Sequence, residues 1–281
     1  MTYSVYHFFK HLVDNINLFN TIDNLEDFPF DMTMLACKNI GQFPDLAIKT
    51  NAVDKVTNPL FSGGEFIEIK DSKTYSVSSF NSTIPQGQKD INEIIKSQNS
   101  AIKKQMEETG NHIYSLPVRD VYYLLRGKHN GNSKIILVHG SFFETIKKDN
   151  LIRQAFEQVL DERLKEKKVN IQDDVHDILI DIFSDQKNFS RVRNIDNASV
   201  KLRFRVMTEV KPEGNILNTA QYPQIKDNTI NLIVPNHYDD EQKIILERFS
   251  AVYDETSAEQ FSVFKIKHHL NGYFTVFQKG L

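Results

Sequence analysis

The chain has 281 residues, of which 40% are apolar and 25% charged, and its net charge of −3 excludes a polycation. No stretch approaches the roughly 18 consecutive apolar residues of a membrane-spanning helix. The start MTYSVYHFFK has no basic leader followed by an apolar run, so we expect a cytoplasmic protein with no membrane partner. Cys37 is the only cysteine, which excludes an internal disulfide and a Cys-rich zinc site.

Apolar periodicity predicts both helices and strands in the first 168 residues. A spacing of three and four, as from Val5 to Ile16, is typical of an amphipathic helix, whereas alternation, as from Phe43 to Thr50, is typical of a strand. We therefore expect helices over residues 5–16, 91–110 and 150–167, and strands over residues 43–50, 65–71, 121–125 and 135–138. The predicted fold class is α/β, with a mixed central sheet flanked by helices.

The remainder of the chain again predicts a helix followed by strands. The helix is expected over residues 173–183, and the strands over residues 200–206, 229–234, 261–267 and 273–278. Asn271-Gly272 lies between the last two strands and is a good signal for a β-hairpin. We divide the chain into a core, residues 1–168, and a C-terminal α+β extension, residues 169–281, packed on that core.

Charged residues interrupt one of the predicted strands, in the stretch GGEFIEIKDSK. Because successive side chains of a strand point to opposite faces, Glu68 and Lys70 share one face and Glu65 lies on the other. Asp45 begins the preceding strand, so pairing of the two strands would gather two carboxylates and an ammonium group. Mg²⁺ is usually held by one or two carboxylates plus substrate phosphate. The pattern therefore predicts a Mg²⁺ site with a nucleophilic water.

Pro44-Asp45, followed by Glu68-Ile69-Lys70 on an apolar strand, resembles the PD-(D/E)XK nuclease superfamily, and within it the type II restriction endonucleases. The resemblance covers roughly residues 43–138, in the order strand, strand, helix, strand, strand. It implies a restriction-endonuclease-like core in which Asp45 and Glu68 are catalytic, metal-binding acids, Lys70 is the catalytic lysine and the Ile69 carbonyl is a further metal ligand. Glu26 is an additional candidate carboxylate, as in some relatives.

The function implied by the resemblance is Mg²⁺-dependent, sequence-specific hydrolysis of phosphodiester bonds in double-stranded DNA. A homodimer is expected, because two-fold symmetric DNA is cut on both strands by two copies of a site. A cognate DNA methyltransferase is implied as a genetic partner. Two alternatives stay open: a repair or recombination nuclease of the same superfamily, and a non-catalytic DNA-binding protein. In the second, the charged residues would form only a salt-bridged surface, as Glu-x-Lys on a strand often does.

Basic residues around and within the predicted strand 200–206 are candidates for DNA contact. The strand alternates apolar with basic side chains, and a bidentate arginine can read guanine in the major groove. The alternative is an exposed edge strand protected by its charge. On this basis residues 169–281 are assigned to DNA recognition or dimerisation. The candidate DNA-binding residues are Lys73, which follows the catalytic pattern, and Arg191, Arg193, Lys201, Arg203 and Arg205.

Other chemistry is less well supported by the sequence. His7 and His11 can share a helical face, but no acidic third ligand accompanies them and HExxH is absent, so we do not expect a zinc site there. The stretch VHGS at residues 138–141 lacks the Gly-x-Ser-x-Gly turn of serine hydrolases.

Overall fold

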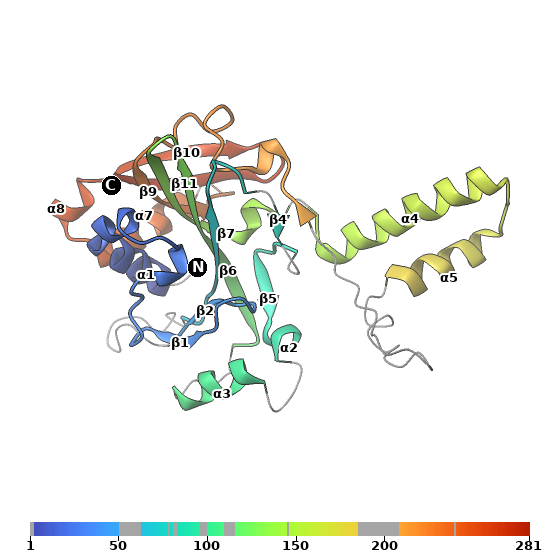
Figure 1. The fold of residues 1–281 in the computed structure, drawn as a ribbon, viewed down its shortest axis with the longest axis horizontal. Helices are drawn as coiled ribbons and strands as arrows, with labels where there is room; N and C mark the ends of the chain where they lie inside the picture. The colour runs from blue at the N-terminus through green and yellow to red at the C-terminus, as the bar shows by residue number, and fades with distance from the viewer. Residues whose placement is uncertain are drawn as a thin grey trace.

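The computed structural model describes residues 3–50, 63–77, 79–80, 84–95, 100–109, 116–144, 146–184, 208–238 and 240–281. Within these residues, nine strands form one mixed sheet (Figure 1). Eight of them follow the order β1-β2-β3-β6-β7-β9-β11-β10, and β5 pairs with β6. Their bounds are β1 Leu35–Lys38, β2 Leu46–Ile48, β3 Phe66–Ser72, β5 Gln88–Asp90, β6 Val118–His129, β7 Asn132–His139, β9 Thr229–Pro235, β10 Ser262–His268 and β11 Gly272–Gly280. A separate two-stranded sheet pairs β4, Ser79–Phe80, with β8, Thr208–Glu209.

The sheet is mixed because two of its neighbouring pairs, β3 with β6 and β7 with β9, are parallel. The pairs β1–β2, β2–β3, β6–β7, β9–β11 and β10–β11 are antiparallel. The hairpin between β6 and β7 turns at Asn130-Gly131, where both residues have positive φ, 50° and 80°. Asn-Gly is the dipeptide preferred in a two-residue turn of this kind.

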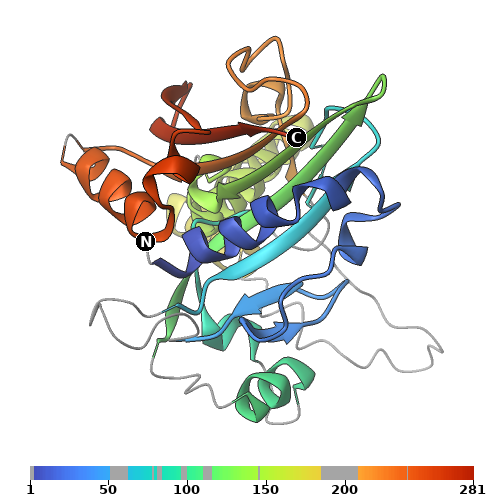
Figure 2. The same ribbon diagram turned by 90° about the vertical axis from the view of Figure 1, so that its left-hand side faces the viewer.

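One face of the sheet is covered by α1, Tyr3–Asp14, and α7, Glu241–Val252. Figure 2 shows α1 lying over this face of the sheet. Leu46, Ile67 and Tyr122 point to this face and belong to the same hydrophobic cluster as the buried side chains of α1. The apolar residues whose spacing predicts this helix from the sequence are therefore the residues that pack against the sheet.

The opposite face is covered by short elements and irregular chain. Ala47, Phe66 and Tyr123 point to it and cluster with apolar residues of α2, Ile91–Ile94, and α3, Ala101–Glu108. The prediction of one continuous helix over residues 91–110 is wrong, because α2 ends at Ile94 and Ile95 has non-helical dihedral angles. Further short helices are η1 Ile16–Asn20, η2 Leu25–Asp27, η4 Gly140–Phe142, η5 Pro212–Gly214 and α8 Glu255–Ala258.

Two long helices, α4 (Lys148–Lys167) and α5 (Asp173–Ser184), form a hairpin that projects away from the sheet (Figure 1). Asp161 Oδ1 and His176 Nε2 are 2.8 Å apart, the rings of Phe156 and Phe183 stack, and Arg153 forms an ion pair with Asp181. These contacts hold the helices to each other. We call this hairpin the arm.

The sequence predicts much of this architecture correctly. The expected α/β class with a mixed sheet flanked by helices is confirmed, as are α1, α4, α5 and the strands β2, β3, β6, β7, β9, β10 and β11. Strands β9, β10 and β11, which follow residue 168, extend the same sheet as the earlier strands; the division at residue 168 stays a prediction. No described helix is both long and apolar enough to pass through a bilayer.

Candidate functional site

Strands β2 and β3, which carry the predicted site, are direct neighbours. Leu46 pairs with Ile67 and Ala47 with Phe66 in antiparallel register, and one further step places Asp45 opposite Glu68. The pairing on which the site prediction depends is thus present. Before β3, Gly63 forms a bridge with Thr50. A Cβ at Gly63 would lie 2.3 Å from the Lys49 carbonyl oxygen, so the close approach of the two segments requires glycine there.

Asp45 is buried and held by backbone amides on both of its carboxylate oxygens. Oδ2 accepts a hydrogen bond from the Ile69 N–H at 2.8 Å, and Oδ1 accepts one from the Gly41 N–H at 2.9 Å. The first of these bonds ties the carboxylate to β3 between Glu68 and Lys70. Each oxygen has a second lone pair, which can bind a cation.

Glu68 and Lys70 lie on the same face of β3, as alternation predicts, and contact each other. Lys70 Nζ donates to Glu68 Oε1 at 2.7 Å, and the Glu68 residue is only 5% exposed. Burial raises the pKa of Glu68, the positive charge of Lys70 lowers it, and the negative charge of Asp45 raises it. Glu68 Oε2 is buried and accepts no hydrogen bond from any described residue. An uncompensated buried carboxylate oxygen is costly unless a ligand binds it.

Glu26 lies within electrostatic reach of this site. The side chain is in η2, and desolvation raises its pKa, as do the negative charges of Asp45, Asp27 and Asp71, whereas Lys70 lowers it. Helix η2 packs on the face of the sheet that carries Ile67, Ile69 and Asp71, opposite to the face of Glu68 and Lys70.

An ion pair between Arg126 and Asp71, which was not predicted from the sequence, holds η2 against the sheet. Arg126 of β6 is fully buried and forms a bidentate pair with Asp71 of β3, with Nε 2.9 Å from Oδ1. Asp71 also accepts from the Leu25 N–H at 2.8 Å, and Arg126 donates to the carbonyl oxygens of Phe19 and Asp23 at 3.0 and 2.8 Å. Each residue is one of several charged positions in its strand, so the sequence alone does not single the two out.

The donor set of the site fits a hard divalent cation. Asp45 and Glu68 supply carboxylate oxygens from adjacent strands, and Glu68 Oε2 has no other described partner. The Ile69 carbonyl lies on the same edge of β3 as its N–H, which faces Asp45. Among the described residues no group of three or more His, Cys, Asp or Glu side chains is arranged to hold a metal. Mg²⁺ needs fewer, since one or two carboxylates with waters and substrate phosphate suffice.

The structure describes one of the six candidate DNA-binding residues. Lys73 is exposed and directly follows the end of β3, three residues after Lys70. Arg191, Arg193, Lys201, Arg203 and Arg205 lie outside the described residues, as does the strand predicted over 200–206.

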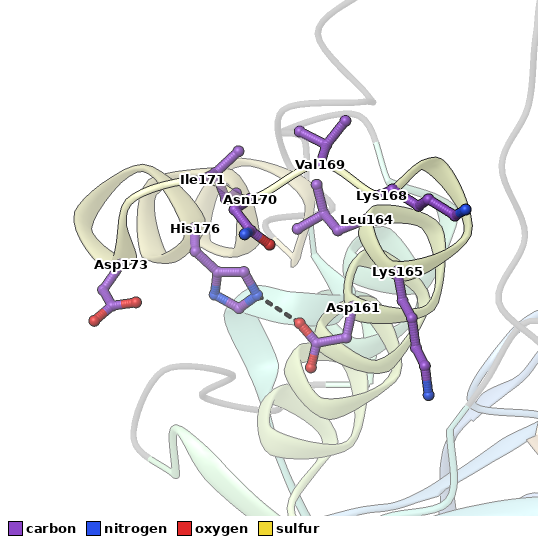
Figure 3. A pocket seen from close by; sticks show the side chains of 9 residues that line it. All are labelled: Asp161, Leu164, Lys165, Lys168, Val169, Asn170, Ile171, Asp173 and His176. Carbon is purple, nitrogen blue, oxygen red and sulfur yellow. Dashed lines mark hydrogen bonds and ion pairs between the residues drawn. The ribbon is translucent and has the colours of Figure 1, made fainter.

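Two cavities in the described part of the molecule lie away from the candidate site. One hollow of about 540 Å³ lies at the tip of the arm, where Leu164, Asn170 and His176 line it (Figure 3). Another, of about 310 Å³, lies beside Tyr75 and His129. Neither is lined by Asp45, Glu68 or Lys70. The candidate site is therefore defined by its charges and its strand pairing.

The histidine and serine of the VHGS stretch do contact each other. His139 Nδ1 is 2.8 Å from Ser141 Oγ and also accepts from the Ser141 N–H at 3.3 Å, while Nε2 lies 3.8 Å from Asp120. The second bond makes the imidazole the N-terminal cap of η4. This structural role accounts for the contact without nucleophilic chemistry.

Comparison with protein-family models, with curated proteins and with solved structures finds no match for this chain. The assignment of a function therefore depends on the geometry of the site.

Proposed function

We propose that the protein is a Mg²⁺-dependent nuclease of the PD-(D/E)XK type that hydrolyses phosphodiester bonds of double-stranded DNA. One observation carries the proposal: Asp45 and Glu68 face each other across the β2–β3 pair, with Lys70 Nζ 2.7 Å from Glu68 and the second Glu68 oxygen unpartnered. Two acids and a lysine on adjacent strands are what the sequence resemblance requires.

The roles of the residues follow from their positions. Bound between Asp45 and Glu68, Mg²⁺ would lower the pKa of a coordinated water and neutralise charge on the scissile phosphate. Asp45 is pre-organised for this by the two amides that fix its orientation. Lys70 is near enough to Glu68 to orient the attacking water and to offset negative charge in the transition state. Attack in line at phosphorus would leave a 5′-phosphate.

Within this class we propose a type II restriction endonuclease that acts in the cytoplasm as a homodimer, alongside a cognate DNA methyltransferase. Two-fold symmetric DNA requires two copies of the site for cleavage of both strands. A repair or recombination nuclease with the same site would prefer branched or damaged DNA. A restriction enzyme would cut a plasmid into discrete fragments.

The proposal is tested by incubating unmethylated phage DNA with the protein in Mg²⁺ or in EDTA. We expect discrete fragments in Mg²⁺ and none in EDTA, and we expect Glu68→Gln and Lys70→Ala each to slow cleavage by on the order of 100-fold or more. Glu259→Gln, which changes an exposed glutamate in the turn after α8, is the matched control and should cut at the normal rate. Cleavage that is unaffected by both site substitutions would remove the site assignment. Absence of metal-dependent cleavage on diverse DNAs would favour a non-catalytic DNA-binding protein.

A further inference from the structure

The cavity of about 310 Å³ opens where β3 and β6 end side by side. The two strands are parallel, with Ser72 opposite Gly127, so the same register carried two residues further brings Thr74 level with His129. Tyr75 and His129 form one part of the wall, and Asn218, from the segment after η5, forms another. Three separate parts of the chain thus meet at this cavity.

Tyr75 is held in place from several sides. A Cβ on Gly127 would lie 3.0 Å from Tyr75 Cδ1, so the absence of a side chain there lets the ring lie directly on β6. Lys134 Nζ lies 4.7 Å from the ring centroid, and Asn215 Nδ2 donates to the Tyr75 carbonyl at 2.9 Å. Lys134 is itself fixed, because it donates to Thr219 Oγ1 at 2.9 Å. The wall of the cavity is therefore formed before any ligand binds.

The remaining wall supplies an aromatic ring and a hydrogen-bond donor. The His129 ring lies 5.5 Å from the Tyr75 ring at an angle of 48°, and the His129 side chain is exposed. Asn218 Oδ1 accepts from the Ala220 N–H at 3.0 Å, which fixes the amide, while Nδ2 donates to no described residue. Aromatic faces together with one oriented amide are the groups that recognise a flat heterocycle with acceptor atoms on its edge.

The distance between the cavity and the candidate active site is one that a single DNA strand can span. Lys70 and Thr74 are four residues apart along β3 and the turn that follows, which corresponds to about 13 Å at 3.3 Å per residue. Along the axis of a DNA duplex, at 3.4 Å per nucleotide of one strand, this is roughly four nucleotides. Lys73 is exposed between the two places and can contact the intervening backbone. A DNA strand whose scissile phosphate is at Glu68 and Lys70 can therefore reach the cavity.

We propose that this cavity takes up one unstacked nucleobase of the DNA substrate, about four nucleotides from the scissile phosphate. The inference rests on the proposed action on DNA and adds to it a site that selects a base. The base lies against His129 and Tyr75 and accepts a hydrogen bond from Asn218 Nδ2. Extrusion of a paired base costs unpairing and unstacking energy, so an already unpaired base enters more easily.

The test measures DNA binding in EDTA, so that no strand is cut. Fluorescence anisotropy gives the affinity for a paired duplex and for four duplexes that each carry one bulged base, A, C, G or T. We expect at least one bulged duplex to bind on the order of tenfold more tightly than the paired duplex, because no pairing has to be broken. His129→Ala and Asn218→Ala should each bring that ratio close to one. His269→Ala, an exposed histidine at the β10–β11 turn, is the matched control and should keep it.

Equal affinity of the unmodified protein for all five duplexes would overturn the inference. It would also be overturned if His129→Ala and Asn218→Ala, with the melting temperature of the unmodified protein, both kept its ratio of affinities for bulged and paired DNA. The result is independent of the nuclease proposal, since cleavage is not measured. A protein that prefers bulged DNA through His129 and Asn218 but does not cut in Mg²⁺ would retain this inference and lose the proposed function.

Discussion

Glu65 and Glu68 show how position on one strand separates the roles of two similar residues. They are three residues apart and point to opposite faces of the sheet. Glu68 lies beside Asp45 and Lys70, whereas Glu65 is fully covered and accepts a 2.5 Å hydrogen bond from Ser4 Oγ of α1. Burial raises the pKa of Glu65 to about 7, opposed by the bond from Ser4. We therefore assign Glu65 to the attachment of α1 and Glu68 to the site.

Replacement of Glu65 by glutamine should stabilise the protein relative to the unmodified chain, and this stabilisation should be larger at pH 8 than at pH 5. An unfolded glutamate loses its proton near pH 4.3, and folded Glu65 does so near 7, so the unmodified protein loses stability as pH rises between these values. Glutamine keeps an acceptor for Ser4 and does not ionise. The expected gain above pH 7 is about 4 kcal/mol, the free-energy equivalent of the pKa difference.

The measurement is the free energy of unfolding by urea at pH 5, 6, 7 and 8 for both proteins. Glu259→Gln, in which the glutamate is exposed, should give a difference that does not change with pH. A constant difference for Glu65→Gln across the same range would show that Glu65 does not titrate in this interval.

At the scale of elements, the Asp71–Arg126 pair joins β3, β6 and the segment that leads into η2. The guanidinium contacts Asp71 on one side and the carbonyl oxygens of Phe19, Ile22 and Asp23 on the other. Because Asp71 directly follows Lys70, the pair also fixes the end of the strand that carries Glu68 and Lys70. Glu26 owes its position near the site to the same contacts.

Asp71→Ala should destabilise the protein substantially, because it leaves a fully buried guanidinium without an anionic partner. Removal of one partner of a buried ion pair costs about 3–5 kcal/mol, and we expect about 3 here because the Asp71 side chain is 27% exposed. Asp14→Ala breaks the exposed Lys10–Asp14 pair of α1 and should cost only about 0.3–0.5 kcal/mol. Urea denaturation of both variants makes the comparison, and similar losses would contradict a structural role for the buried pair.

Sequence patterns predict the elements whose contacts are local or periodic. Alternation placed Glu68 and Lys70 on one face, and the spacing of apolar residues found α1, α4 and α5. Strand β1 was missed because its four residues, LACK, are too few to alternate. Helix α7 was also missed, although Ile245, Phe249 and Val252 have the spacing of a buried helical face, which could have found it.

The pairing of β2 with β3 and the burial of Arg126 could not be derived from the sequence. The two strands are separated by a long connection, and register depends on which side chains pack on each face of the finished sheet. Arg126 contacts residues about a hundred positions away, and no local pattern reports such a contact.

At the scale of the whole molecule, the arm lies outside the described apolar core of the sheet. The two hydrophobic clusters on the faces of the sheet contain no residue of α4 or α5, and the arm is held together by its own contacts. The first and last turns of the hairpin are close, since Arg153 pairs with Asp181.

Replacement of residues 148–184 by a short Gly-Ser linker should therefore leave the body folded. We expect the melting temperature to change by only a few degrees, because the apolar clusters formed by the described residues of the body contain no side chain of the arm. Differential scanning calorimetry of the shortened protein tests this, with Asp71→Ala as a variant that should melt much lower. Failure of the shortened protein to fold would show that the arm stabilises the sheet.

The central claim is that Asp45 and Glu68 together bind a divalent cation. The most direct test is a crystal structure of the protein soaked in CaCl₂, with the unsoaked crystal and Glu68→Gln as comparisons. We predict one Ca²⁺ between the two carboxylates, at about 2.3–2.6 Å from Asp45 and from Glu68 Oε2, and its loss in Glu68→Gln. Asp45 and Glu68 in the positions described here, with no cation between them at high Ca²⁺ concentration, would contradict the claim.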